Sequence, residues 1–173
     1  MKRIILITGL MLLLVGCGAK TTFETVEDVY AQPVSVQSRQ MVVSLPEGAA
    51  ALTAQMGETG EIYFCDGYTI TVQVTQSGNL GETLRQTTGF EKEELQLIQT
   101  QHDGVKRYEC VWVAAGEGED QLGRAAVLDD GVSHYVLTCM TGASEAQDLQ
   151  EQWQEIFTSF RLLSQEEQIR TGS

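Results

Sequence analysis

Histidine, cysteine and basic residues are scarce in this sequence, and no hydrophobic run is long enough to cross a membrane. The 173 residues include two histidines, four cysteines and 11 Lys or Arg against 24 Asp or Glu, for a net charge of −13. Nucleic-acid binding needs a basic footprint, so this charge balance excludes it. The longest apolar run, Ile4 to Val15, is ~18 Å long as a helix, against ~30 Å for a hydrocarbon core.

Catalytic and metal-binding motifs are also missing. The chain has no Gly-x-Ser-x-Gly, no His-Glu-x-x-His and no Ser-x-x-Lys set, and no Cys-x-x-Cys pair. His102-Asp103 could bind a metal weakly, but we interpret it as a surface pair at a turn. His134 is expected to be a partly exposed residue at a strand end. The sequence therefore predicts no catalytic residue, no metal ligand and no cofactor, and it does not identify a ligand-binding residue.

The N-terminus contains a short leader. Lys2 and Arg3 precede the apolar run, which ends in Leu14-Val15-Gly16-Cys17. A basic start, a short apolar core and small residues at its end are typical of a cleaved signal peptide. The last four residues resemble the lipobox of bacterial lipoproteins. An ordinary signal peptide with a chance cysteine, or a short helical anchor, is the alternative.

The lipobox resemblance implies that Cys17 is the lipid attachment site and becomes the mature N-terminus. Two or three acyl chains such as palmitate would hold the protein on a bilayer, which one chain does only marginally. The implied location is the extracytoplasmic face of a cell membrane. The sequence leaves open whether this is the only membrane of a Gram-positive cell or the outer membrane of a Gram-negative one.

The sequence divides into four parts. We assign residues 1–16 to the signal peptide, 17–38 to a lipid-anchored tether, 39–163 to a single domain and 164–173 to a flexible tail. Cleavage removes two basic residues, so the charge changes from −13 to −15 over the remaining 157 residues. A chain of that size buries ~68–70% of its unfolded surface, enough for one core. The acidic domain is expected to stand off from anionic lipid.

Three Asp-Gly dipeptides predict hairpins, because type I′ turns need positive φ at both central residues. Asp66-Gly67 joins 61–65 to 68–75, Asp103-Gly104 joins 95–101 to 105–114, and Asp130-Gly131 joins 121–128 to 132–140. A further strand is predicted at 41–45, before Pro46, and residues 48–60 read as a loop or short helix. Gly116-Glu-Gly-Glu119 is expected to be a solvated loop.

The strands differ in their patterns. Residues 68–75 alternate apolar and polar side chains, as in a strand with one wet face. In 105–114, Tyr108, Cys110 and Trp112 share one face and Val111 and Val113 the other; 132–140 is also apolar on both sides. We therefore expect the middle of the sheet to be covered on both faces.

The cysteines are expected to be small buried thiols. Once Cys17 is acylated, an odd number remains: Cys65, Cys110 and Cys139. In a simple meander, strand 121–128 separates Cys110 from Cys139 by two strand spacings, ~9.6 Å, so no disulfide joins them.

Two helices are predicted. Asn79-x-x-Glu82 resembles a capping box, with Leu80 and Leu84 inward and Gly89 at the end. Ser144-x-x-Gln147 opens a second helix, whose apolar residues follow helical spacing: Leu149, Trp153, Ile156, Phe157 and Phe160.

The element order defines an α+β fold: a mainly antiparallel sheet of about six strands, built from a hairpin and a meander, with helices packed on its faces. The Asp-Gly hairpins, Tyr135-Val-Leu-Thr-Cys139 and Trp153-x-x-Ile-Phe-x-Ser-Phe160 together resemble small bacterial lipoproteins with a PsbP-like α/β/α sandwich, including uncharacterised clostridial lipoproteins. The resemblance covers about residues 39–163 and implies a non-enzymatic role, without assigning any functional residue.

We interpret the chain as a non-catalytic binding or accessory module of the cell envelope. Its expected partners are membrane lipid, through acylated Cys17, and an unknown envelope protein or small ligand, with no nucleic acid. The alternative is an envelope hydrolase with a carboxylate or histidine site that no motif reveals. A transport substrate-binding protein is disfavoured because 157 residues do not make two lobes around a cleft.

Overall fold

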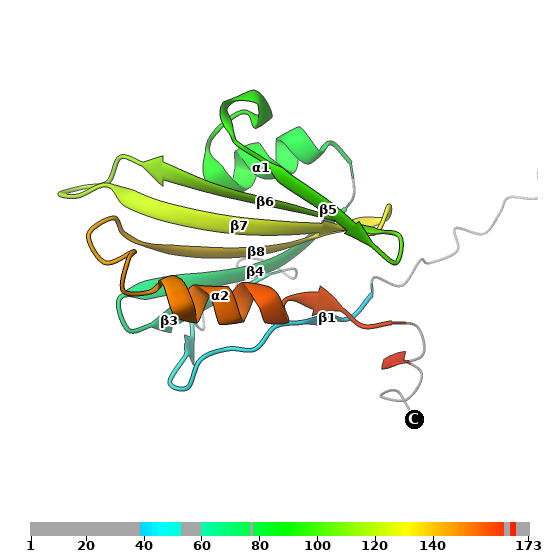
Figure 1. The fold of residues 1–173 in the computed structure, drawn as a ribbon, viewed down its shortest axis with the longest axis horizontal. Helices are drawn as coiled ribbons and strands as arrows, with labels where there is room; N and C mark the ends of the chain where they lie inside the picture. Colours follow the sequence, from blue (N-terminus) through cyan, green and yellow to red (C-terminus); the bar gives the residue numbers. More distant parts are fainter. Residues whose placement is uncertain (1–38, 53–59, 77, 165–166, 169–173) are drawn as a thin grey trace, which may run out of the picture. The chain divides into compact units, whose positions relative to one another are not determined.

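The computed structural model describes residues 39–52, 60–76, 78–164 and 167–168. They form a seven-stranded antiparallel sheet in the order β2-β3-β4-β8-β7-β6-β5, a separate two-stranded sheet β1-β9, and two α-helices (Figure 1). This confirms the predicted α+β fold, with one more strand in the main sheet than expected. Among these residues, no helix has the length and hydrophobicity that a membrane span requires.

The elements follow the chain in this order: β1 Met41–Val42, β2 Ala50–Ala51, β3 Gly60–Cys65, β4 Tyr68–Gln76, α1 Leu80–Thr88, the 3₁₀ helix η2 Lys92–Glu94, β5 Ile98–His102, β6 Val105–Ala114, β7 Gln121–Asp129, β8 Ser133–Gly142, α2 Gln150–Ser159 and β9 Arg161–Leu162.

All three predicted hairpins are present, but only one has the predicted turn type. Asp103 and Gly104 both have positive φ, at 49° and 77°, as a type I′ turn requires. At the other two turns only the glycine is in the left-handed region: Gly67 at 77° and Gly131 at 86°. The third turn is also longer, because the Asp130 carboxylate accepts the backbone N–H groups of Val132 and Ser133.

The N-terminal part of the fold differs from the expectation. The strand predicted at 41–45 is two residues long and pairs with β9, where Met41 lies opposite Leu162. Ala50 and Ala51 form the edge strand β2, which sequence patterns did not predict because alanine has low strand propensity. The remainder of the uncertain stretch, residues 53–59, lies outside the described residues.

The two helices cover opposite faces of the sheet (Figure 1). On the α2 side, Trp153, Ile156 and Phe157 pack on side chains of β4, β7 and β8. On the α1 side, Leu84 packs with Cys110, Trp112 and other side chains of β6, β7 and β8. Covering both faces was therefore the correct expectation for β7 and β8.

The first helix begins as predicted, although without a full capping box. The Asn79 side chain accepts the Gly81 N–H at 2.9 Å, and Gly89 ends the helix with φ 80°. Glu82 pairs with Arg85 at 2.8 Å instead of returning to the Asn79 backbone.

The second helix begins at Gln150, six residues after the predicted cap, and Leu149 at its N-cap makes no side-chain capping bond. The Ser144 hydroxyl donates to Glu119 at 2.7 Å, in the loop between β6 and β7. The prediction of a Ser144 cap is therefore wrong, because a contact distant in sequence takes its hydroxyl.

The described cysteines are all free thiols. β7 lies between the strands of Cys110 and Cys139, and the two side chains point to opposite faces of the sheet. Burial raises the pKa of Cys110 to about 11 and that of Cys139 to about 12. Both thiols therefore stay protonated and unreactive at neutral pH.

His134 is buried, so the expectation of a partly exposed strand end is wrong. Its side chain is 1% exposed, and Nδ1 lies 2.7 Å from the Thr83 hydroxyl of α1. Helix α1 covers the start of β8, and this contact was not visible in the sequence.

Candidate functional site

The residues with a predicted role fall into two groups. Leu14, Val15, Gly16 and Cys17 lie outside the described residues. His102 forms an exposed turn pair with Asp103, at 3.5 Å. In the described part of the chain, no three His, Cys, Asp or Glu side chains are grouped as a metal site requires.

The described residues leave part of the α2 side of the sheet uncovered. β5 and the second half of β6 present Ile98, Val111 and Val113 to solvent, with 70%, 54% and 51% of their surfaces exposed. Cross-strand register and alternation place all three on the same face as Glu109 and Arg124. We call the α2 side of β5 and β6 the bare half-face; there, the prediction of a covered sheet is wrong.

The corresponding uncovered area on the α1 side, over β3 and β4, has a different composition. Thr69, Thr71 and Gln73 of β4 are partly exposed there, with Phe64 of β3 49% exposed and Leu52, directly after β2, 40% exposed. Such a surface is usual for a sheet with one wet face. On the bare half-face, each of the three apolar side chains has more than half of its surface exposed, and exposed apolar patches mark interaction sites.

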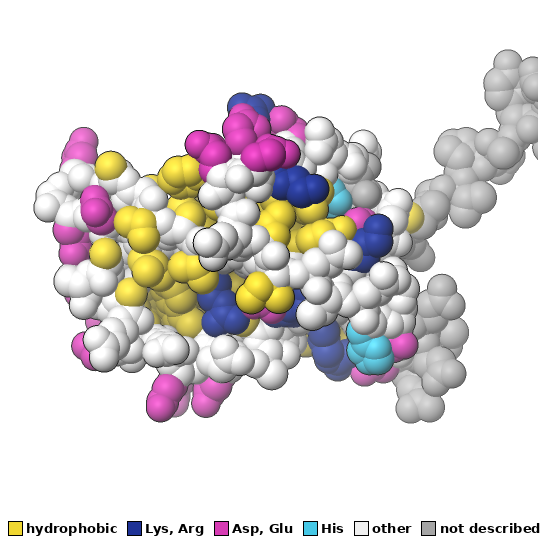
Figure 2. All heavy atoms as spheres, turned by 45° about the horizontal axis from the view of Figure 1, so that its top comes forward, with side chains coloured by type: hydrophobic (Ala, Val, Ile, Leu, Met, Phe, Trp, Pro, Cys, Tyr) yellow, Lys and Arg dark blue, Asp and Glu magenta, His cyan; other side chains and the backbone are white. Residues whose placement is uncertain are grey.

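Three hollows form a groove between α2 and the bare half-face. The largest, about 470 Å³, is lined by Val111, Leu122, Arg124, Trp153 and residues 143–150. One of about 290 Å³ lies between Ile98, Val111 and Arg124, and one of about 200 Å³ lies beside Phe157. Arg124 lines all three, so the hollows adjoin. Figure 2 shows hydrophobic side chains beside Lys and Arg side chains on this surface.

Two arginines share one carboxylate at the centre of this groove. Arg107 donates to Glu109 at 2.6 Å and Arg124 donates to it at 2.9 Å. Arg124 also stacks on the Phe157 ring, 4.2 Å from its centroid. Arg107 additionally donates to the carbonyls of Phe157 and Phe160, at the end of α2. The arrangement fixes both guanidinium groups and leaves one positive charge in excess.

The ionisation of Glu109 follows from these contacts. Its burial alone would raise the pKa of the carboxyl, but the hydrogen bonds from Arg124 and Arg107 outweigh this, so the pKa lies below its ordinary value. Glu109 is therefore ionised at neutral pH, and the cluster carries a net charge of +1.

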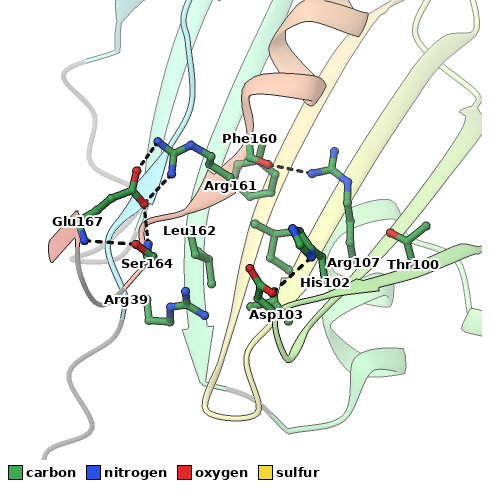
Figure 3. Close-up of a pocket in the computed structure, with 12 residues that line it drawn as sticks. Arg39, Thr100, His102, Asp103, Arg107, Phe160, Arg161, Leu162, Ser164 and Glu167 are labelled. Atoms are coloured by element: carbon green, nitrogen blue, oxygen red, sulfur yellow. Dashed lines mark hydrogen bonds and ion pairs between the residues drawn. The ribbon is translucent and has the colours of Figure 1, made fainter.

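A fourth hollow, of about 360 Å³, continues the groove past Arg107. Figure 3 shows Arg39, Arg107 and Arg161 approaching it from three segments, with Phe160 and Leu162 beside them. Arg161 is paired with Glu167 at 3.1 Å. Among the described residues no carboxylate is within ion-pair distance of Arg39, whose guanidinium donates to the Leu163 carbonyl.

The hydrolase alternative requires a pocket that holds a histidine with carboxylates, and this hollow contains His102, Asp103 and Glu167. Catalytic acids usually have raised pKa values in sites shielded from water. Here the Ser164 backbone N–H and Arg161 lower the pKa of Glu167 to about 2. The His102 and Asp103 side chains are 92% and 84% exposed. The geometry supports ligand contact better than acid–base catalysis.

Sequence reasoning missed the Arg107–Glu109–Arg124 cluster. Its signal was present: Arg107 and Glu109 are two residues apart in β6, and Arg124 is the one charged residue within the apolar stretch 122–128 of β7. Only the register between β6 and β7, with Glu109 opposite Ala126 and Val111 opposite Arg124, shows that they meet.

No family model and no curated protein matches the chain in sequence. Solved structures do match its fold. The solution structure of cyanobacterial PsbP (CyanoP) from Synechocystis sp. PCC 6803 aligns with TM-score 0.51 and 11% identity, over 76% of this chain and 96% of that one. LpqN, involved in cell envelope biogenesis of Mycobacterium tuberculosis, aligns with TM-score 0.50 and 12% identity, over 73% and 85%. The fold is PsbP-like, as the sequence resemblance implied.

Proposed function

We propose that this protein is a lipid-anchored, extracytoplasmic module of the cell envelope that binds a partner without catalysis, through the bare half-face. The sequence supports this location: Leu14-Val15-Gly16-Cys17 stands at the end of an apolar run too short to span a bilayer. The likeness to LpqN, involved in envelope biogenesis, is consistent with that location but rests on fold alone.

The bare half-face is the observation that carries the binding role. Fully burying an exposed apolar side chain of this size contributes ~1.5–3 kcal/mol. Ile98, Val111 and Val113 are 70%, 54% and 51% exposed, so covering each would contribute roughly half to two-thirds of that free energy. The chain's own α2 stops short of them. A partner that covers Ile98, Val111 and Val113 would gain this free energy, and the fixed arginines beside them would orient it.

The anchoring part of the proposal is tested by Cys17→Ala. We expect the wild-type protein to incorporate labelled fatty acid and to sediment with membranes, and the variant to lose the label and to accumulate as the uncleaved precursor. Normal processing of Cys17→Ala, with cleavage near residue 17, would instead identify an ordinary signal peptide.

The binding part is tested by photo-crosslinking in the native cells. A photoreactive amino acid placed at Val111 should yield a discrete adduct with a second molecule. The control position is Gln99, which is exposed but faces the α1 side of β5. Equal adduct patterns at both positions, or none at Val111, would remove the support for a binding surface here.

A further inference from the structure

We propose that the occupant of the bare half-face is an amphipathic α-helix of a partner protein, with an apolar stripe bordered by carboxylates. This inference rests on the proposed function only in taking that surface as the binding site. It adds the secondary structure and the charge of the partner segment.

The geometry favours a helix that lies on the face of the sheet. Val111 and Val113 are ~6.7 Å apart along β6, and Ile98 of β5, which lies opposite Glu109, is the diagonal neighbour of Val111. Where β5 pairs with β6, as far as Ile98 opposite Glu109, the distance from β7 to β5 is ~9.6 Å, which matches the ~10 Å diameter of a helix. A helix there would lie next to α2 and complete that layer.

A strand added to the open edge fits these observations less well. It would lie in the plane of the sheet and pair through its backbone. The apolar side chains of Val111 and Val113 project out of that plane, so their exposed surface would remain largely uncovered. The hollows beside Arg124, one of which is also lined by Gln150 and Trp153 of α2, would stay empty as well.

The charges of the groove favour a negatively charged partner segment. Among the described carboxylates, Arg107 and Arg124 pair only with Glu109, so the groove has a surplus positive charge within an acidic protein. A carboxylate placed there would gain a fixed guanidinium partner, whereas a lysine would meet like charge. A second copy of this chain is disfavoured, because after loss of the two basic leader residues its net charge is −15.

The test uses the full lipidated chain in phosphatidylcholine nanodiscs and three fluorescent peptides of about 14 residues, ~21 Å as helices. The first has leucines at helical spacing bordered by glutamates. The second has lysine at every glutamate position, and the third has the composition of the first in an order without a helical stripe. Empty nanodiscs give the background for each peptide.

We expect the glutamate peptide to bind at least about tenfold more tightly than the other two. The lysine peptide places like charge beside Arg107 and Arg124, and the third peptide has no apolar stripe to cover the exposed side chains. Ile98→Asp should abolish this preference, whereas Gln99→Asp, the adjacent position on the opposite face, should not. Arg124→Glu should reverse the charge preference, and Arg85→Glu on α1 is the matched control.

Equal or tighter binding of the lysine peptide, equal binding of the peptide without a stripe, or no binding of any would overturn the inference. The proposed function has a separate readout. If the peptides fail while the crosslinker at Val111 still captures a second molecule in cells, the surface binds a partner of other chemistry. If neither experiment gives a signal, both proposals fail.

Discussion

At the scale of single residues, His134 couples the stability of the fold to pH. Its ring is buried, and burial lowers its pKa even though Asp129 and Asp130 act in the opposite direction. The unfolded chain therefore binds the proton more readily than the folded one. The contribution to stability is complete above the unfolded pKa of ~6.5 and is lost as the pH falls toward the folded value.

We predict that the free energy of unfolding of the wild-type chain, measured by urea denaturation, falls between about pH 7.5 and pH 5.5, by up to ~1.4 kcal/mol per pH unit within that window. His134→Gln should show a smaller decrease. His102→Gln, at an exposed position, should retain the decrease of the wild type. A His134→Gln profile parallel to the wild-type profile would assign the pH dependence to the carboxylates.

Gly123 shows how closely β6 and β7 pack on the α1 side. It lies opposite Trp112, and a Cβ added at Gly123 would collide with the indole ring. We predict that Gly123→Ala destabilises the fold by ~1–3 kcal/mol, since overpacked cores must shift side chains or backbone. Denaturation followed by tryptophan fluorescence measures this. Gly78→Ala is the control, because an added Cβ there has open space.

At the scale of elements, the two helices show what a capping pattern can and cannot predict. Both Asn79-x-x-Glu82 and Ser144-x-x-Gln147 fit the pattern, but only Asn79 caps its helix. The difference lies in tertiary contacts: Ser144 is bonded to Glu119 across a loop. A pattern of four residues contains no information about such a contact.

The helix starts give a paired prediction. Asn79→Ala should lower the free energy of unfolding by ~1 kcal/mol, because the Gly81 N–H loses its acceptor. Ser144→Ala removes one exposed hydrogen bond and no cap, so the change should stay within ~0.5 kcal/mol. Chemical denaturation of both variants measures the difference, and equal losses would mean that Ser144 contributes as much as a cap.

The strands likewise divide into those that the local sequence predicts and those that it does not. Asp-Gly dipeptides located all three hairpins, because a turn and its flanking strands are encoded within a few residues. The pairing of β1 with β9 was not predictable, since it joins residues about 120 positions apart. Neither of these short strands has the length or alternation that identifies a strand in sequence.

At the scale of the whole fold, the uncovered part of the α2 side explains why the candidate site was missed. Val111 and Val113 were correctly placed on one face of β6, and the apolar character of that face was taken to mean cover by the chain's own helices. An apolar surface is more stable when it is buried than when it is exposed to water. Its composition does not show whether the same chain or a separate molecule buries it.

The small β1-β9 sheet has a mechanical consequence. The backbone N–H of Arg39 donates to the Tyr135 hydroxyl at 2.6 Å, Leu163 donates to the Gln40 carbonyl at 2.8 Å, and Ser44 donates to Ser159 at 2.8 Å. Tension applied along the chain ahead of residue 39 would therefore load β8 and the end of α2 together. The edge strand β2 would not be the first element to bear the force. Force from the N-terminal side would therefore not begin by separating the strands of the large sheet.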